Sequence, residues 1–564
     1  MKFSQYTYQR VEFNEFETEY KKALELLKDA PSFEEQSNAI SVISKISKKF
    51  DTAANLVAIR HSIDTTDSFY ADEQNYIDSV SPAVWNLTVE YYKALNQSPF
   101  KEQLISTYGK QIFVYAELAT LTVNEAILAD MKEENMLRTE YEKLLASASI
   151  PFDGEDRNLA GLEPFMESPD REIRKRASEA RFGWMASKMN DLDSIYDKLV
   201  KTRHNMAQKM GFENFIPMGY ARMRRSGYGP EEIAEFRNLI FEEVVPLANE
   251  LKKRQAKRLG LESLMYYDYS FSYNTGNPTP KGNPDWIINH GKTMYDELSP
   301  ETSSFFRFML DKELMDLVNK KGKAGGGYCT YIADYQSPFI FSNFNGTSHD
   351  IDVLTHEAGH AFQVFNSREL PLDEYYWPTS EAAEIHSMSM EFFTWPWMNL
   401  FFEADTDKYY FTHLSSSMQF LPYGTTVDEF QHKVYANPDM SPEDRRKTWR
   451  EIELKYTPWK KYEGNEYLMN GGYWQRQAHI YASPFYYIDY VLAQICAFQF
   501  WVRMRQDKNA AWNDYVKLCK AGGSMPFLDL VQLAGLKSPF KKETLKEVVS
   551  QISEYLNTVD DTKL

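Results

Sequence analysis

Apolar residues recur every three or four positions over most of the chain, which is the spacing of a helix that buries one face. In the N-terminal third the pattern is clearest in three segments: 17–27, 32–49 and 101–128. Helical patterning also covers about 196–256, returns near residue 350 and continues to the C-terminus. The pattern predicts a mainly α protein, with an N-terminal helical lobe over 1–195 and a second lobe over 196–564.

The strongest β signal lies between Ala324 and Phe344. β-branched and aromatic residues gather there after three glycines and around Pro338, which favours two short strands. Segment 270–286 is dense in Gly, Pro and Asn, so we expect a loop. The sequence therefore predicts a small β element immediately before the helical pattern that resumes near residue 350.

Two histidines flank a glutamate in the segment HEAGH, residues 356–360. Side chains four positions apart on a helix lie about 40° from one another, so His356 and His360 project to one side, with Glu357 about 60° further round. Imidazole nitrogens are ordinary ligands of Zn²⁺, and a catalytic zinc site keeps a fourth position open for water. The spacing predicts His356 and His360 as zinc ligands and Glu357 as the glutamate that acts on that water.

The rest of this helix argues against a chance arrangement. Its apolar residues collect on the face opposite the histidines: Leu354, Ala358, Ala361, Phe362 and Phe365. Core packing would instead have put the histidines within the apolar stripe. Thr347 to Asp350 has the form of a capping box, which predicts that the helix begins there. Gly359 is a poor helix former, and we expect it to leave room for the backbone of another element.

A zinc with two histidine ligands needs a third donor, which in helix-borne sites comes from a later helix. The acidic residues downstream are Glu369, Asp373, Glu374, Glu381, Glu384 and Glu391. The first three surround Pro371 and are expected in an exposed turn. Glu384 and Glu391 are seven apart and share one face of the next helix. Position alone does not choose between Glu381 and Glu384.

The segment from Glu384 to Glu391, EIHSMSME, together with HEAGH, resembles the M3 family of zinc oligopeptidases, in particular its oligoendopeptidase F and Pz-peptidase branch. The family signature is HExGH followed by E-x-x-S-x-x-x-E, and Ser387 falls in step with it. The resemblance implies that Glu384 is the third ligand of one Zn²⁺ per chain and that Glu391 orients a ligand histidine. It also implies a two-lobed helical zincin of the gluzincin type, with a small β-sheet next to the zinc helix and a deep central channel.

Peptide hydrolysis also needs a donor for the charge that develops on the carbonyl oxygen. M3 enzymes carry a histidine and then tyrosines at helical spacing near the C-terminus, and these residues bind the tetrahedral intermediate. His479 and Tyr490 match this pattern best, and Tyr487 is our candidate for a second tyrosine, with Tyr486 on the adjoining face. More distant members have a tyrosine where this chain has Ser483, so the pattern leaves the second tyrosine open.

Composition limits the classes of partner that the protein is expected to bind. The net charge is −18, so a nucleic-acid backbone would be repelled, and we expect no nucleic acid partner. No N-terminal apolar segment or long apolar run is present, which predicts a cytoplasmic protein without a membrane partner. Three widely spaced cysteines, Cys329, Cys496 and Cys519, fit reduced thiols. We expect a monomer or small homo-oligomer.

The first functional hypothesis is a zinc oligoendopeptidase that cleaves internal bonds of short, unstructured peptides, with an edge strand near 328–344 pairing with the peptide backbone. A zinc carboxypeptidase of related fold is the alternative, and it requires a basic anchor such as Arg476 or one of the arginines in 222–225. A binding protein without chemistry would have lost a ligand or Glu357, and all are present. A zinc hydrolase of other substrates would not need the strand or the tyrosines.

Overall fold

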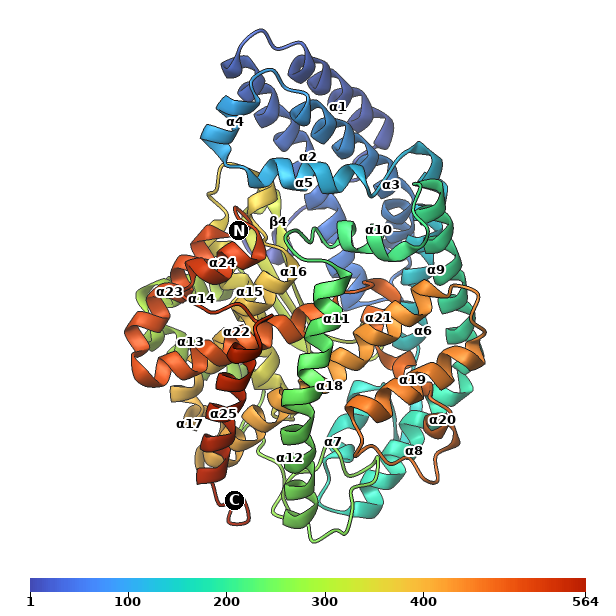
Figure 1. Cartoon of the computed structure of the whole chain (residues 1–564), viewed down its shortest axis with the longest axis vertical. Coiled ribbons are helices and arrows are strands. Elements are labelled where there is room, and N and C mark those ends of the chain that lie inside the picture. Colours follow the sequence, from blue (N-terminus) through green and yellow to red (C-terminus); the bar gives the residue numbers. More distant parts are fainter.

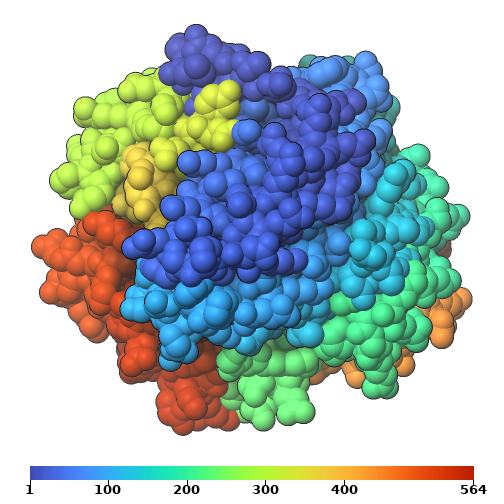
Figure 2. Space-filling model, turned by 90° about the horizontal axis from the view of Figure 1, so that it is seen from above, coloured from blue at the N-terminus to red at the C-terminus, as the bar shows by residue number.

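The computed structural model describes residues 1–564 and is mainly helical (Figure 1). Three long helices open the chain: α1 (Phe13–Lys28), α2 (Phe33–Ile63) and α3 (Ser68–Asn96). They pack against one another at the top of the view in Figure 1, and seen from above they occupy the middle of that face (Figure 2). The predicted helices 17–27 and 32–49 are confirmed as parts of α1 and α2.

The prediction of one continuous helix over 101–128 is wrong, because this segment is divided into shorter helices. The chain instead forms α4 (Lys101–Tyr108) and α5 (Gln111–Thr120), and α6 (Leu128–Ala146) follows after a turn. Gly109 ends α4 with a φ of 88°, a left-handed conformation that glycine adopts without steric penalty. Apolar periodicity runs through the break, so the pattern alone did not reveal it.

Eight helices link this region to the sheet: α7 (Glu163–Met166), α8 (Arg171–Ser187), α9 (Met189–Lys209), α10 (Phe215–Arg222), α11 (Pro230–Leu239), α12 (Val245–Arg258), α13 (Pro284–Leu298) and α14 (Pro300–Asp311). The long connection between α12 and α13 contains most of the predicted loop 270–286, whose last three residues instead lie in α13, after its N-cap Asn283. Helix α9 runs unbroken through residue 195, and the division of the chain there stays a prediction.

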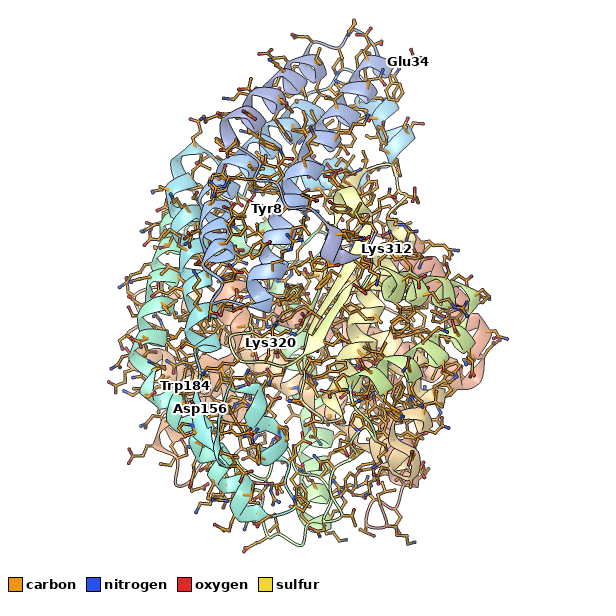
Figure 3. The ribbon with its side chains drawn as sticks, turned by 180° about the vertical axis from the view of Figure 1, so that it is seen from behind. Tyr8, Glu34, Asp156, Trp184, Lys312 and Lys320 are labelled. Atoms are coloured by element: carbon orange, nitrogen blue, oxygen red, sulfur yellow. The ribbon has the colours of Figure 1, made fainter.

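Strands β3 (Met315–Val318), β4 (Tyr328–Ile332) and β5 (Ser337–Phe344) form one sheet in the order β3-β5-β4. Strand β5 is parallel to β3 and antiparallel to β4, so β4 lies at an edge. Figure 3 shows the sheet at the middle of the molecule, beside the N-terminal helices. The two predicted strands are confirmed as β4 and β5, whereas the four residues of β3 were too few to show alternation.

A second β element was missed. Strands β1 (Ile150–Phe152) and β2 (Glu155–Arg157) form a hairpin around Asp153 and Gly154, whose φ angles are 53° and 80°. Positive φ at both central residues is the geometry of a type I′ turn, for which Asp-Gly is a preferred pair. The turn signal is present in the sequence, but strands of three residues carry no alternation to support it.

The rest of the chain is helical: α15 (His349–Ser367), α16 (Ser380–Phe393), α17 (Asn399–Phe402), α18 (Thr406–Ala436), α19 (Pro442–Tyr456), α20 (Glu466–Met469), α21 (Ala478–Ala482), α22 (Tyr487–Gln506), α23 (Lys508–Ala521), α24 (Phe527–Leu533) and α25 (Lys542–Thr558). Helix α15 lies on β4 and β5, α16 packs against α15, and α22 packs against α16 and α18. One continuous apolar core joins these helices to the N-terminal ones, and the three cysteines are free thiols.

No single helix is long and apolar enough to cross a lipid bilayer. The segments Gln111–Thr120 and Glu125–Ala146 reach that length and hydropathy only when taken together, across a bend of 57°.

Candidate metal centre and active site

Helix α15 begins at His349, close to the predicted start, but the predicted capping box does not form. The Asp350 carboxylate instead accepts hydrogen bonds from the backbone N–H groups of Asn345 and Gly346, both at 2.9 Å. The Thr347 hydroxyl donates to the Asn345 side chain at 2.8 Å rather than capping the helix. The carboxylate therefore orders the loop before α15 and fixes where the helix leaves the sheet.

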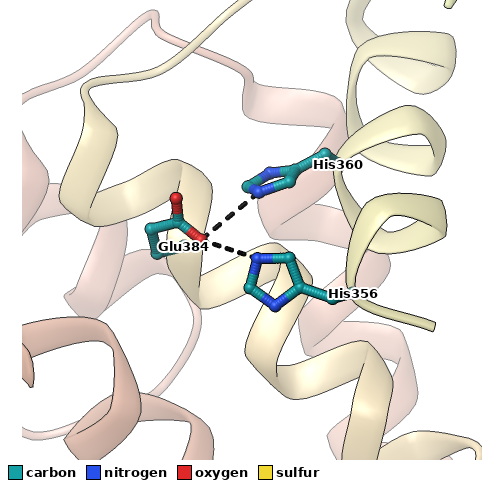
Figure 4. Close-up of side chains that lie close together, drawn as sticks. All are labelled: His356, His360 and Glu384. Atoms are coloured by element: carbon teal, nitrogen blue, oxygen red, sulfur yellow. Dashed lines mark ion pairs between the residues drawn. The ribbon is translucent and has the colours of Figure 1, made fainter. Parts of the chain in front are cut away.

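His356, His360 and Glu384 bring three donor atoms to one point (Figure 4). Glu384 Oε2 lies 3.2 Å from His356 Nε2 and 3.3 Å from His360 Nε2. Ligand atoms about 2.0–2.1 Å from a tetrahedral Zn²⁺ are about 3.3 Å apart, so these separations match the edges of such a tetrahedron. Two imidazoles and one carboxylate, with room for a fourth group, are the donor set of a catalytic zinc site.

Of the two acids that position left open, Glu381 and Glu384, only Glu384 lies beside the two histidines. Glu381 accepts a hydrogen bond from the Tyr228 hydroxyl at 2.8 Å, away from the histidines. Glu384 also accepts from Ser387 at 2.8 Å and from Tyr486 at 2.5 Å, so both of its oxygens are held. Burial raises the pKa of Glu384, but the two histidines outweigh it and hold that pKa well below its ordinary value.

Gly359 is the point where α15 meets α16. A Cβ at this position would lie 2.7 Å from the carbonyl oxygen of His386 and 2.7 Å from Ser387 Cα, closer than real Cβ contacts occur. The prediction that this glycine admits another backbone is confirmed. The close approach brings Glu384, on α16, within reach of the two histidines on α15.

Glu391 connects a ligand histidine to the protein interior. His356 Nδ1 lies 2.7 Å from one Glu391 oxygen, and His413 Nε2 lies 2.8 Å from the other. The Trp395 indole N–H donates to His413 Nδ1 at 3.0 Å, which leaves the proton of a neutral His413 on Nε2, facing Glu391. With its Nδ1–H donated to Glu391, His356 keeps the Nε2 lone pair for a cation.

His413 was given no role from the sequence, and no spacing signal marks it. It lies on α18, so only the fold brings it to Glu391. His386, on α16, has both ring nitrogens buried without a hydrogen-bond partner.

Glu357 faces the cavity that His356 also lines, on the side of Gly327. A Cβ at Gly327 would lie 3.3 Å from Glu357 Oε1, so the glycine keeps this approach open. Glu357 Oε2 is buried and has no hydrogen-bond partner in the protein. Burial raises the pKa of Glu357, which favours a carboxyl that exchanges protons with a bound water or substrate.

His479 and Tyr490 meet across the same cavity, with the Tyr490 hydroxyl 3.2 Å from His479 Nε2. The Gln477 amide N–H donates to His479 Nδ1 at 2.9 Å, and its oxygen accepts from the Tyr423 hydroxyl at 2.8 Å. With Nδ1 accepting, the imidazole proton lies on Nε2 and points to the Tyr490 oxygen. The Tyr490 O–H is then free to donate into the cavity. Burial lowers the pKa of His479 to about 4, which keeps the ring neutral at pH 7.

The neighbouring tyrosines have different positions. Tyr487 lines the cavity, and its ring centroid lies 5.2 Å from that of His479. Tyr486 was placed only on the adjoining face from the sequence, yet its hydroxyl reaches Glu384 directly. The structure therefore brings Tyr486 to a candidate metal ligand and Tyr487 to the cavity wall.

Four cavities lie on the two sides of the candidate ligands. Two of them, of about 690 and 380 Å³, share Trp85 and Arg224 as lining residues. The catalytic cavity of about 400 Å³ and a neighbour of about 290 Å³ share Thr412. Tyr486, which lines the 380 Å³ cavity, contacts Glu384. The deep central channel stays a prediction.

The chain matches two sequence models of one peptidase family. The model of the peptidase M3 N-terminal domain matches residues 3–123, and that of peptidase family M3 matches 164–280 and 300–550. The chain belongs to peptidase family M3. The second match contains every candidate site residue described above.

Known relatives of this M3 peptidase are oligopeptidases. Oligopeptidase PepF of Bacillus subtilis is 21% identical, over 94% of this chain and 82% of its own. Oligoendopeptidase F of Lactococcus lactis subsp. cremoris is 24% identical, over 88% of this chain and 85% of its own. The solved structure of Pz-peptidase A with an inhibitor is 55% identical over 100% of both chains, with a TM-score of 0.99. The M3 peptidase is therefore a metallo-oligopeptidase with this family's helical fold.

Proposed function

We propose that this M3 peptidase is a zinc-dependent oligoendopeptidase that hydrolyses internal bonds of short, unstructured peptides. The observation that carries the proposal is a cluster of three donor atoms in which Glu384 lies at tetrahedral separations from both histidines, with Glu357 beside them in a cavity. His356, His360 and Glu384 would hold one Zn²⁺ per chain. Bound zinc lowers the pKa of a water ligand and polarises a carbonyl group.

Glu357 is the general base of the proposed reaction. Its carboxylate accepts a proton from the attacking water and then passes that proton to the amine that leaves. The raised pKa of Glu357, which burial causes, suits both transfers, since the group must take and release a proton near neutral pH.

Tyr490 is the proposed donor to the carbonyl oxygen as that oxygen gains charge. His479 holds the Tyr490 oxygen from one side at 3.2 Å, so the hydroxyl hydrogen can point toward substrate. Removing one such donor in other hydrolases lowers the rate by about 10²–10³-fold. Tyr487 contributes to the wall against which the substrate lies, and His479 acts by positioning Tyr490.

Two features support restriction to short peptides. Strand β4 lies at a sheet edge and begins at Tyr328, directly after Gly327, so an extended peptide could pair with it beside Glu357. The catalytic cavity has a volume of about 400 Å³, which suits a few extended residues and not a folded domain. A cytoplasmic location and a monomeric or small homo-oligomeric state are part of the same proposal.

Quenched fluorescent peptides with both ends blocked test this function. We expect wild type to cut an internal bond, identified by mass spectrometry, and Glu357→Gln to lose this activity while its zinc content stays the same. A blocked peptide left intact, with residues trimmed from free C-termini, would support the carboxypeptidase alternative. For that alternative Arg222 and Arg225 are poor anchors, because they are paired with Glu134 and Asp489.

A further inference from the structure

The cavity of about 380 Å³ next to the candidate metal ligands is unusually basic. We call it the arginine cavity; it lies between α3, α5, α6 and α10. Arg138 on α6, Arg222 at the end of α10 and Arg224 after it line the cavity, together with Glu134. Tyr486 also lines it, and the Tyr486 hydroxyl donates to Glu384. The arginine cavity therefore comes within one side chain of a candidate metal ligand.

Carboxylates satisfy the other arginines of this region but not Arg138 and Arg224. Arg203 and Arg222 donate to the two oxygens of Glu134, at 2.7 and 2.8 Å, so no oxygen of Glu134 is left for Arg138. Arg138 and Arg224 take part in none of the ion pairs or side-chain hydrogen bonds of the chain. Arg138 is exposed and Arg224 is half-buried, so both guanidinium groups are open to a ligand that enters the cavity.

The nearby acids do not compensate these two charges directly. Asp78 accepts hydrogen bonds from Thr139 at 2.7 Å and from Gln74 at 2.9 Å. Desolvation lowers the pKa of Arg138 against the attraction of Glu134, and repulsion from Arg203 and Arg222 adds to the lowering. An anion in the cavity would relieve that repulsion.

The backbone holds the second guanidinium in place. Arg224 has a φ of 55°, a left-handed conformation that non-glycine residues seldom adopt, and its guanidinium carbon lies 4.9 Å from the centre of the Tyr115 ring. Arg224 and Trp85 also line the adjoining cavity of about 690 Å³, where Glu374 acts on Arg224 electrostatically without forming an ion pair. Arg224 therefore lies at the passage between the two cavities.

We propose that the arginine cavity binds a carboxylate of the peptide substrate through Arg138 and Arg224, and so selects peptides that place a carboxylate there. The planar guanidinium fork matches a carboxylate in a bidentate arrangement. The carboxylate is supplied either by an Asp or Glu side chain or by the free C-terminus. This inference rests on the proposed peptidase function and assigns a specificity site to it.

The test compares kcat/KM for matched peptides. In a quenched reference peptide with Gln at each variable position and an amidated end, Gln is replaced by Glu one position at a time, and a free-acid form is made of each peptide. We expect wild type to prefer one Glu position, or the free acid, by about tenfold or more, since hydrogen bonds to charged groups are worth this much. The position that responds identifies the source of the carboxylate.

Variants then assign the preference to the two arginines. Arg138→Met and Arg224→Met should bring the ratio between the Glu and Gln peptides close to one, while Arg138→Lys and Arg224→Lys keep the charge and should keep part of it. Arg176→Gln is the control, because Arg176 is exposed on α8 and lies outside the cavity; its ratio should equal that of wild type.

The results distinguish failure of the proposed peptidase function from failure of the proposed carboxylate site in the arginine cavity. If wild type does not cut the reference peptide in a zinc-dependent way, the proposed function itself fails. If it cuts the peptide but shows no preference for any carboxylate, or if Met and Lys variants keep the full wild-type ratio, the arginine cavity is not a carboxylate site. Should a Met variant fail to fold, the Lys variant decides, because loss of the bidentate fork alone should still reduce the ratio severalfold.

Discussion

Replacing Gly359 by alanine tests whether the approach of α15 to α16 builds the metal site. The added Cβ would lie 2.7 Å from His386 O and from Ser387 Cα, and ordinary van der Waals contact begins at 3.4 Å, so the helices must separate by about 0.7 Å. Both neighbouring atoms belong to the backbone and cannot rotate away. The separation between Glu384 Oε2 and the histidine nitrogens, now 3.2 and 3.3 Å, would grow toward about 4 Å.

The expected result is a defect in metal binding larger than the defect in folding. A displacement approaching 1 Å at a reacting centre costs about 10²-fold in rate, so kcat/KM should fall by about that factor, and zinc affinity by about 10–100-fold. Overpacking destabilises by about 1–3 kcal/mol, of which the better helix propensity of alanine recovers about 1 kcal/mol. The free energy of unfolding should therefore fall by no more than about 2 kcal/mol.

The assay combines competition with a chromogenic zinc chelator, peptide hydrolysis and denaturant unfolding of the metal-free protein. Gly183→Ala on α8 is the matched control, because nothing lies within 4 Å of its added Cβ, and it should raise stability by about 0.5–1 kcal/mol without affecting zinc. If Gly359→Ala bound zinc and hydrolysed peptide as wild type does, the close helix contact would not be what sets the ligand geometry.

Three further changes have defined outcomes. Glu391→Ala should lower zinc affinity by about 10–100-fold, because His356 loses its anchor; unchanged affinity in the chelator assay would contradict this. Tyr490→Phe should lower kcat by about 10²–10³-fold with little change in KM, and a loss confined to KM would rule out a role for its hydroxyl in the transition state. Burial, with like charges such as Asp373, raises the pKa of Asp51 to about 7. Because the pKa in the folded state lies above that in the unfolded state, the free energy of unfolding should fall as the pH rises from about 4 to about 7. Asp51→Asn should therefore raise Tm at pH 8 more than at pH 4. An equal shift at the two pH values would contradict the raised pKa.

The helix of the candidate metal site was predictable because its donor residues follow a local spacing along the chain. His356 and His360 are one helical turn apart, the apolar stripe lies on the other face, and Gly359 marks where a backbone approaches. The third ligand was less determined, since Glu381 and Glu384 occupy the same helix, and only the motif through Ser387 favoured Glu384. In the structure Ser387 donates to Glu384, which gives that motif a physical basis.

The parts that sequence did not predict depend on contacts between distant segments. His413 reaches Glu391 because α18 packs near α16, and no periodicity along the chain contains that information. The break at Gly109 was hidden because helical periodicity continues on both sides of it. The unpaired state of Arg138 follows from Glu134 being taken by arginines from elsewhere in the chain, which only the fold could show.

Zinc content and peptidase activity, measured on the same samples of wild type, Glu357→Gln and Glu384→Gln, test the central claim most directly. The account predicts one zinc per chain in wild type and in Glu357→Gln, with activity only in wild type, and loss of both zinc and activity in Glu384→Gln. Full zinc content in Glu384→Gln, or full activity in Glu357→Gln, would contradict it.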